Sequence, residues 1–163
     1  MGNRIETKCV QAGWTPKNGE PRILPIYQST TYKYDSAAQI GRIFDLQEEG
    51  HTYSRLSNPT VAGLEEKIAQ LEGGVGALCT ASGQSANFFS VFNIASCGDN
   101  FVAFTSIYGG SVNLFAVTFQ RMGIQVRFAT PQMCDEELDA LFDERTRCVF
   151  GESIANPALN VFD

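Results

Sequence analysis

Residues that can contact an anion or a planar ring follow three of the apolar runs in this chain. The three sets are Ser82-Gly83-Gln84, Tyr108-Gly109-Gly110, and Glu152 with Asn156. Backbone amides at the start of a helix bind phosphate, and an exposed aromatic ring stacks on a planar ligand. A carboxamide next to a proline-fixed loop can hold a phenolic oxygen or a ring substituent. Together these sets predict a ligand site.

Ser82-Gly83-Gln84 is the candidate phosphate-binding turn. Small residues between a strand and a helix allow the amides of Gly83 and Gln84 to approach an anion, where the helix dipole adds about 0.3 to 2 kcal/mol. Gln84 is expected to act through its backbone, so that its side chain matters little. For so short a motif, an ordinary strand-to-helix turn is an equal alternative. Tyr108, taken alone, would more often be a packing residue.

The segment from Tyr53 to Thr60 carries the strongest single motif, Tyr-Ser-Arg-Leu-Ser-Asn-Pro-Thr. Tyr53 and Arg55 are predicted to alternate along an extended segment and to present a hydroxyl and a guanidinium to one anion. Arginine binds phosphate through charge-assisted, bidentate hydrogen bonds. The alternative is an exposed loop arginine beside a packing tyrosine.

Four apolar, β-branched or aromatic runs are predicted to be the strands that position these residues. They are Val75–Thr80, Phe101–Thr105, Ile124–Ala129 and Cys148–Gly151. Helices are expected between them, over Gln84–Ala95, Gly110–Met122 and Asp135–Phe142. This alternation favours right-handed βαβ units, and hence an α/β fold with a mostly parallel sheet and helices on both faces. Ligands of such sheets bind at the carboxyl ends of the strands, where the candidate residues lie.

Residues 1–60 differ from the rest and are predicted to form an extended arm. Their only helical pattern covers residues 37–44, after a Ser36 cap. An arm that cannot build a core is expected to lie on a neighbouring subunit. Residues 61–163 are expected to form the first part of a larger domain. That part begins with a helix between Asn58-Pro59-Thr60 and Gly73-Gly74.

Composition excludes several classes of protein. A net charge of −6 and a pI near 4.8 argue against a nucleic-acid or anionic-membrane surface, because both favour clustered Lys and Arg. The five cysteines are odd in number and lie mostly in apolar runs, which is typical of a reducing compartment. One histidine and no close cysteine pair leave no zinc-ligand set. The apolar runs are too short to span a bilayer. We expect a cytoplasmic protein with no bound metal.

Five motifs resemble the cystathionine γ-synthase-like family of pyridoxal-phosphate (PLP) enzymes of cysteine and methionine metabolism. They are Tyr53-Ser54-Arg55 with Asn58-Pro59-Thr60, Leu71-Glu72-Gly73-Gly74, Ser82-Gly83-Gln84, Tyr108-Gly109-Gly110, and Glu152-Ser153 with Asn156-Pro157. The stretches 11–14, 25–32, 50–53 and 82–86 are most similar to the O-acetylhomoserine sulfhydrylase branch of that family. The resemblance covers essentially the whole chain. It implies the large domain of an aspartate aminotransferase-like fold, and a homotetramer built from dimers with shared sites.

The resemblance also implies which residues bind the phosphate of the cofactor. Gly83 and Gln84 would donate backbone amides to it, with Ser82 in the same turn. Tyr53 and Arg55 would reach the phosphate that is bound by the neighbouring subunit. The independent prediction of a phosphate site at this turn agrees with that assignment.

Three further residues are implied to lie against the pyridine ring. Tyr108 would stack on the ring and, close to the leaving group of the substrate, help to move a proton, which makes it the candidate catalytic residue. Glu152 would lie near the ring as a supporting acid. Asn156 would contact the phenolic oxygen of the ring.

The implied reaction is a γ-replacement in which O-acetyl-L-homoserine and sulfide give L-homocysteine and acetate. A γ-lyase or cystathionine γ-synthase of the same family is the near alternative, because the fold and cofactor contacts would be the same. A non-catalytic assembly or binding fragment is the alternative of a different class.

The lysine required for PLP chemistry is missing from the predicted site. Such enzymes need a lysine that forms a Schiff base with the cofactor, and usually a carboxylate on the pyridine nitrogen. The lysines of this chain are Lys8, Lys17, Lys33 and Lys67, and none of them follows a predicted strand. The family places these groups after the position of Asp163. We therefore expect the amino-terminal part of a longer enzyme, inactive on its own.

Overall fold

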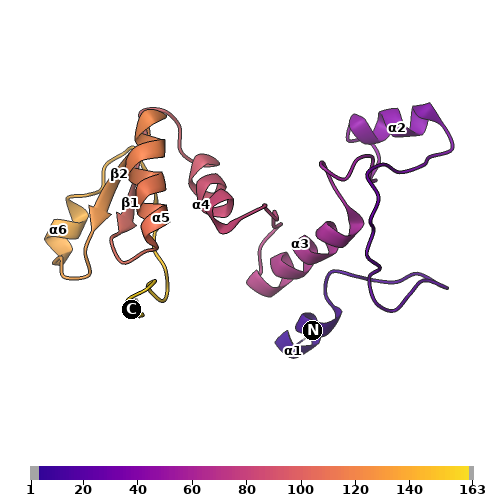
Figure 1. Cartoon of the computed structure of the whole chain (residues 1–163), viewed down its shortest axis with the longest axis horizontal. Coiled ribbons are helices and arrows are strands. Elements are labelled where there is room, and N and C mark those ends of the chain that lie inside the picture. The colour runs from indigo at the N-terminus through magenta and orange to yellow at the C-terminus, as the bar shows by residue number, and fades with distance from the viewer. Residues whose placement is uncertain (1–3, 162–163) are drawn as a thin grey trace. The chain divides into compact units, whose positions relative to one another are not determined.

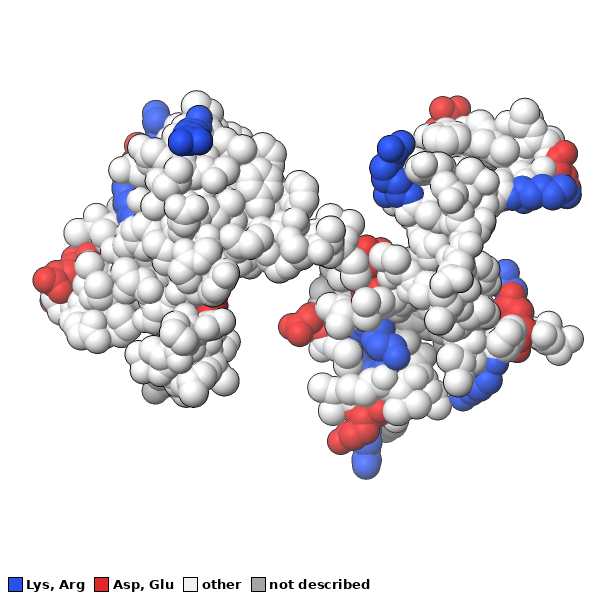
Figure 2. All heavy atoms as spheres, viewed as in Figure 1, with Lys and Arg blue, Asp and Glu red and all other residues white. Residues whose placement is uncertain are grey.

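The structure, a computed structural model, describes residues 4–161. The chain divides into two compact units, Met1–Cys79 and Thr80–Asp163. Figure 1 follows them by colour, with the first three helices in indigo to magenta and the sheet in orange to yellow. On the face drawn in Figure 2, basic and acidic side chains of the first unit are interspersed rather than gathered by sign.

The first unit contains three helices joined by long irregular segments. They are α1 (Ile5–Gln11), α2 (Ala37–Phe44) and α3 (Pro59–Glu72). The hydroxyl of Ser36 accepts a hydrogen bond from the amide of Gln39, which caps α2 as predicted. Helix α1 was not predicted, since seven residues without a side-chain cap or a buried residue leave little signal in the sequence.

Helix α3 begins and ends where the sequence predicts. The side chain of Asn58 accepts a hydrogen bond from the Thr60 amide, Pro59 occupies the first turn, and Gly73 ends the helix in the left-handed conformation at φ 68°. The amino-terminal segment packs along this helix. Lys8 Nζ donates to the carbonyl of Gln70 at 3.0 Å, and Lys67 Nζ donates to that of Cys9 at 3.1 Å.

The second unit is built on a three-stranded parallel sheet. Its strands are β1 (Asn100–Phe104), β2 (Gln125–Ala129) and β3 (Thr146–Phe150), in the order β2-β1-β3. In the β1–β2 pair, Phe101 lies opposite Val126 and Phe104 opposite Ala129. All five residues of the central strand β1 are buried. The predicted parallel sheet is confirmed.

Helices cover both faces of this sheet. They are α4 (Gly83–Phe92), α5 (Gly109–Asn113) with the π-helical turn η1 (Leu114–Phe119), and α6 (Asp135–Asp139). Phe101 and Ala103 pack with residues of α4 and η1, whereas Val102 and Phe104 pack with Leu138 of α6. Side chains along β1 point alternately to the two faces of the sheet, so this one strand contributes to two hydrophobic cores.

One predicted strand is wrong. Residues 75–80 form neither a strand nor a bridge, and the side chains of Val75 and Leu78 are exposed. A strand exists only through hydrogen bonds to a partner, and within residues 4–161 no strand lies beside this segment. The segment has the apolar pattern of a strand, but this pattern does not show whether a partner strand lies beside it.

The predicted helix Gly110–Met122 is also more complex than expected. It begins one residue earlier, as α5, and continues as η1 before a final short turn. A π-helical turn inserts an extra residue and rotates the side chains that follow it. Phe115 and Phe119, both completely buried, pack against Phe101 with ring centroids 5.0 and 5.8 Å away. Helices α4 and α6 each end three residues before the predicted position.

Candidate functional site

The carboxyl ends of β1 and β3 bring Tyr108 and Glu152 together. Tyr108 is the N-cap residue of α5, shortly after β1, and Glu152 follows β3. Because the two strands are parallel neighbours, both chains leave the sheet at the same edge. Glu152 Oε1 accepts a hydrogen bond from the backbone amide of Tyr108 at 3.0 Å. Glu152, the predicted acid, therefore binds the loop that carries Tyr108, the predicted aromatic residue.

The ring of Tyr108 lies over the backbone of Gly110. A Cβ placed on Gly110 would overlap Tyr108 Cε1 and would lie 3.0 Å from Cδ1. Half of the tyrosine surface is nevertheless exposed. The absence of a side chain at Gly110 thus leaves room for one side of the Tyr108 ring, and half of the residue stays accessible.

The first turn of α4 offers free backbone donors. Ser82 Oγ accepts a hydrogen bond from the Ser85 amide at 3.1 Å, and none of the described residues accepts one from the amides of Gly83 or Gln84. A Cβ on Gly83 would meet nothing within 4 Å, so the approach to these amides is open. Two unpaired amides at the start of a ten-residue helix fit a phosphate group.

The side chain of Gln84 connects this turn to the Tyr108 loop. Its Nε2 donates to the carbonyl of Gly110 at 3.0 Å, and its Oε1 accepts from Ser111 Oγ at 3.4 Å. The same Ser111 hydroxyl, completely buried, accepts from Asn87 Nδ2 at 2.9 Å. The Gln84 side chain, which was expected to matter little, therefore forms two hydrogen bonds with the loop that follows Tyr108. Asn87 and Ser111 were not predicted to belong to the site, because their only signal in the sequence is that each is a polar residue within an apolar helical pattern.

A cavity of about 510 Å³ opens at the same edge of the sheet. Glu152 lines it, together with residues that follow β1 and β2, including Ser106 and Thr130. Asn156, the last predicted contact, is exposed, precedes a cis proline, and forms no hydrogen bond with the described residues. The structure therefore gathers Ser82, Gly83, Gln84, Tyr108 and Glu152 through direct contacts and leaves Asn156 at the margin.

Tyr53 and Arg55 belong to the first unit. The predicted extended segment is wrong, because the Tyr53 carbonyl accepts hydrogen bonds from the amides of Leu56 and Ser57 at 2.9 and 3.1 Å and closes a turn. The turn nevertheless brings the two side chains together, with the Arg55 guanidinium carbon 5.0 Å from the centre of the Tyr53 ring. A cation over an aromatic face is favourable, and the remaining guanidinium N–H groups stay available.

Asn58 holds this turn in place. Its Nδ2 donates to the carbonyl of Tyr27, to the hydroxyl of Tyr32 and to Ser54 Oγ, at 2.9, 3.0 and 3.1 Å. Its Oδ1 at the same time caps α3. The position of Arg55 is therefore tied to the start of α3 and to a segment of chain about thirty residues earlier.

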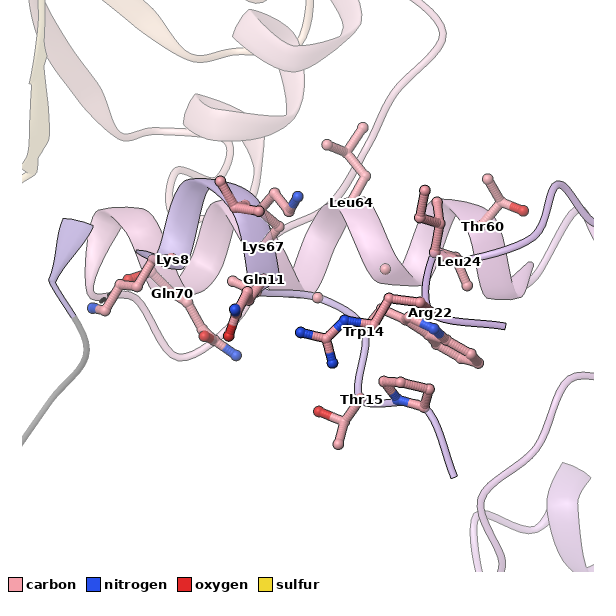
Figure 3. A pocket seen from close by; sticks show the side chains of 16 residues that line it. Lys8, Gln11, Trp14, Thr15, Arg22, Leu24, Thr60, Leu64, Lys67 and Gln70 are labelled. Carbon is pink, nitrogen blue, oxygen red and sulfur yellow. Dashed lines mark hydrogen bonds between the residues drawn. The ribbon is translucent and has the colours of Figure 1, made fainter. Parts of the chain in front are cut away.

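A second cavity, of about 590 Å³, lies within the first unit (Figure 3). Helices α1 and α3 line it together with the segment 12–24, and the half-buried ring of Trp14 faces it. Lys8, Arg22 and Lys67 contribute positive charge, and no lining residue is acidic. The three cations do not converge on one point in Figure 3, and two of them bond backbone carbonyls.

The shortest ion pair among the described residues lies at the opposite end of the sheet from Tyr108. Asp143 precedes β3, accepts from Asn100 Nδ2 at 2.8 Å and pairs with Arg127 Nη2 at 2.6 Å. The hydrogen bond from Asn100, followed by that from Arg127, holds the pKa of the Asp143 carboxyl well below its usual range. This network ties the amino ends of the strands together, away from the candidate site.

The described residues contain no cluster of side chains able to hold a metal ion, and no helix among them is long and apolar enough to cross a membrane.

The family model of Cys/Met metabolism PLP-dependent enzymes matches residues 6–163. The chain belongs to this family of PLP-dependent enzymes. The resemblance seen in the motifs is thereby confirmed.

Similar family members cover nearly the whole chain. O-acetyl-L-homoserine sulfhydrylase 1 of Thermus thermophilus is 46% identical over 98% of this chain, which corresponds to 38% of that protein. Homocysteine/cysteine synthase of Kluyveromyces lactis is 41% identical over 100% of the chain, which corresponds to 37% of that protein. The chain thus spans less than two fifths of these curated relatives.

Solved structures of the family share this fold. A putative O-acetylhomoserine (thiol)-lyase from Campylobacter jejuni, solved with a pyridoxyl-lysine group, has a TM-score of 0.89 at 34% identity, covering 99% of this chain and 40% of its own. Cystathionine γ-lyase from Lactobacillus plantarum has a TM-score of 0.78 at 26% identity, covering 98% of this chain and 39% of its own. The predicted fold class of PLP-dependent enzymes is confirmed.

Proposed function

We propose that this chain is the amino-terminal part of a PLP-dependent O-acetylhomoserine sulfhydrylase. The reaction would combine O-acetyl-L-homoserine with sulfide to give L-homocysteine and acetate. Family membership supports the cofactor, and the sulfhydrylase and synthase names of relatives at 41 and 46% identity support the substrates. We place the protein in the cytoplasm, where its five cysteines would remain free.

The observation that carries the proposal is the pair of unpartnered amides at the start of α4, joined through Gln84 to the loop of Tyr108. Gly83 and Gln84 would donate these amides to the cofactor phosphate, with Ser82 shaping the turn. The chemistry of the donors matches the charge of the ligand, and the open space beside Gly83 leaves room for it.

Tyr108 would lie against the pyridine ring, with Asn156 near the phenolic oxygen. The bound cofactor would supply an electron sink that lets protons leave the carbon atoms of the amino-acid substrate. Gly110 leaves room for one side of the Tyr108 ring, and the exposed half of the residue would be available for stacking. The hydroxyl of Tyr108 would hold or deliver a proton beside the departing acetate. Glu152 would fix the Tyr108 loop through the backbone amide.

Tyr53 and Arg55 would complete the phosphate site of a neighbouring subunit. The Arg55 guanidinium lies over the Tyr53 ring, so the two side chains are already next to each other. This assignment requires a homo-oligomer, which we propose to be a tetramer built from dimers. Residues 1–60 would be the arm that reaches the neighbour, and residues 61–163 the first part of the PLP-binding large domain.

An assay of the complete protein that contains this chain tests the proposal. Purified protein loaded with PLP is supplied with O-acetylhomoserine and sulfide, and homocysteine is measured. Parallel reactions replace sulfide with cysteine, or supply methionine or cystathionine alone. Homocysteine formation as the fastest reaction is the expected result. Fastest formation of cystathionine would indicate a cystathionine γ-synthase, and fastest release of ammonia and a 2-oxo acid a γ-lyase. A complete protein that binds no PLP would indicate a non-catalytic assembly subunit.

A further inference from the structure

One residue, Gln84, takes part in both halves of the candidate site. Its backbone amide is one of the two free donors at the start of α4, and its carboxamide bonds the loop of Tyr108. The two halves come from segments that lie 26 residues apart, counted from Gln84 to Gly110. No other side chain of the Ser82-Gly83-Gln84 turn contacts the Tyr108 loop within the described residues.

The contact acts on the residue that supports the tyrosine ring. Gln84 Nε2 donates to the Gly110 carbonyl at 3.0 Å, and the Tyr108 ring occupies the space that a Cβ on Gly110 would need. A shift of Gly110 would therefore move the ring that lies on it. The second bond, from Ser111 Oγ to Gln84 Oε1 at 3.4 Å, orients the carboxamide so that its nitrogen faces Gly110.

A buried side chain holds that orientation. Ser111 is completely buried, and its hydroxyl accepts from Asn87 Nδ2 at 2.9 Å, so its proton is directed toward Gln84. Asn87 stands on α4 itself, one turn after Gln84. Helix α4 thus holds the start of α5 through two carboxamides. Gln84 is exposed and contributes little packing to the core.

We infer that the Gln84 side chain is a positioning residue that sets the spacing between the phosphate-binding amides of α4 and the stacking ring of Tyr108. The inference rests on the proposed function, since it concerns a ligand that carries both a phosphate and a planar ring. Loss of the carboxamide should weaken a ligand that uses both ends. A ligand that uses only the phosphate end should bind unchanged, because the Gly83 and Gln84 amides do not depend on the side chain.

The test compares two probes on the complete protein freed of cofactor. The first is 4-deoxypyridoxine 5′-phosphate, which has the phosphate and the ring but no aldehyde to react with lysine. The second is inorganic phosphate. Dissociation constants are measured by calorimetry for the unsubstituted protein and for Gln84→Met, which keeps the backbone amide and the side-chain length. Gln120→Met is the matched control, since Gln120 is exposed, helical and forms no side-chain hydrogen bond.

Gln84→Met should weaken the ring-bearing probe by about tenfold, a change similar in size to the contribution of a hydrogen bond, while the dissociation constant of phosphate stays within about twofold. Gln120→Met should change neither. Equal weakening of both probes would overturn the inference, because it would mean that the turn itself had collapsed. Unchanged binding of both would also overturn it. If the unsubstituted protein bound neither probe, the proposed function itself would fail.

A second measurement separates positioning from general loss of structure. Ser111→Ala should weaken the ring-bearing probe in the same direction, and the double variant Gln84→Met/Ser111→Ala should be no weaker than Gln84→Met alone. When two residues are coupled, the effect of the double substitution on the binding free energy is smaller than the sum of the single effects, whereas the effects of independent residues add. Full additivity of the two effects would overturn the inference.

Discussion

Glu152 and Tyr108 are joined by a hydrogen bond of 3.0 Å from a backbone amide to a carboxylate oxygen, across 44 residues of sequence. Tyr108 caps α5 after the central strand, and Glu152 follows its neighbour β3. The contact fixes where the Tyr108 loop leaves the sheet. It also gives Glu152 a second candidate role, that of an acceptor that anchors a loop, beside the predicted role of an acid near the cofactor ring.

Substitutions of Glu152 distinguish these two roles. Glu152→Gln keeps an oxygen that can accept from the Tyr108 amide, so turnover by the complete enzyme should fall by less than about threefold. Glu152→Ala removes the acceptor and should lower turnover by about tenfold or more, since a hydrogen bond to a charged group contributes about 1.5 to 3 kcal/mol. Steady-state kinetics of both variants provide the measurement. Equal damage from both would favour the role of a charged acid.

Tyr108 should show separate contributions from its ring and its hydroxyl. In the complete enzyme, Tyr108→Phe keeps the aromatic face and should bind PLP nearly as well, while turnover of O-acetylhomoserine falls by about 10² to 10⁴. Tyr108→Ala should additionally lose about tenfold in cofactor affinity, the size of a stacking contact. Titration of the apoenzyme and initial rates test both. Unchanged binding and turnover in both variants would make Tyr108 a packing residue.

Gly110 offers a test of the ring position that leaves Tyr108 in place. Gly110→Ala puts a methyl group where the Tyr108 ring lies, so the ring must swing away. Cofactor affinity should fall by about tenfold, as for removal of the ring. Gly109→Ala is the control, because its Cβ would meet nothing within 4 Å. If both glycine variants bound PLP equally well, the ring of Tyr108 would not contribute to binding.

Arg55 should act across a subunit boundary. Arg55→Ala should lose PLP on dialysis, because a hydrogen bond to a charged group contributes about 1.5 to 3 kcal/mol. Arg22→Ala, another exposed arginine of the first unit, should retain it. Mixed oligomers of Arg55→Ala subunits with subunits that lack the cofactor lysine should regain part of the activity, since one intact site can form from two defective chains. Hybrids that form but stay inactive would place Arg55 in its own subunit's site.

Asp143 should make folding stability depend on pH at the acidic end. Its pKa is lowered in the folded protein, first by the Asn100 hydrogen bond and then by Arg127. A lowered folded-state pKa gives stability that is complete above the unfolded pKa of about 4 and is lost as the pH falls toward the folded value. Asp143→Asn should therefore lower the Tm at pH 7, and the difference from the parent should shrink at pH 3. Asp139→Asn, an exposed control on α6, should show neither effect.

The sequence alone determined the features that depend on neighbouring residues. Ser36 caps α2 and Asn58 caps α3 through amides two or three residues away, and Gly73 ends α3, so each signal lies within one helical turn. The division of Phe101 and Ala103 from Val102 and Phe104 between two cores likewise follows from the period of a strand. The order of strand and helix patterns along the chain predicted a sheet covered on both faces.

Tertiary structure decided every contact that joins distant segments. Glu152 meets Tyr108 because β1 and β3 are parallel and end at one edge of the sheet, and the register between strands is not encoded in either strand alone. Gln84 meets Gly110 because helix α4 lies beside the start of α5. Residues 75–80 have the pattern of a strand but no partner among the described residues. Arg55 meets Tyr53 through a turn that Asn58 holds by bonds to residues about thirty positions earlier. Local hydrogen bonds can be predicted from adjacent residues, whereas these pairings depend on the packing of the whole unit.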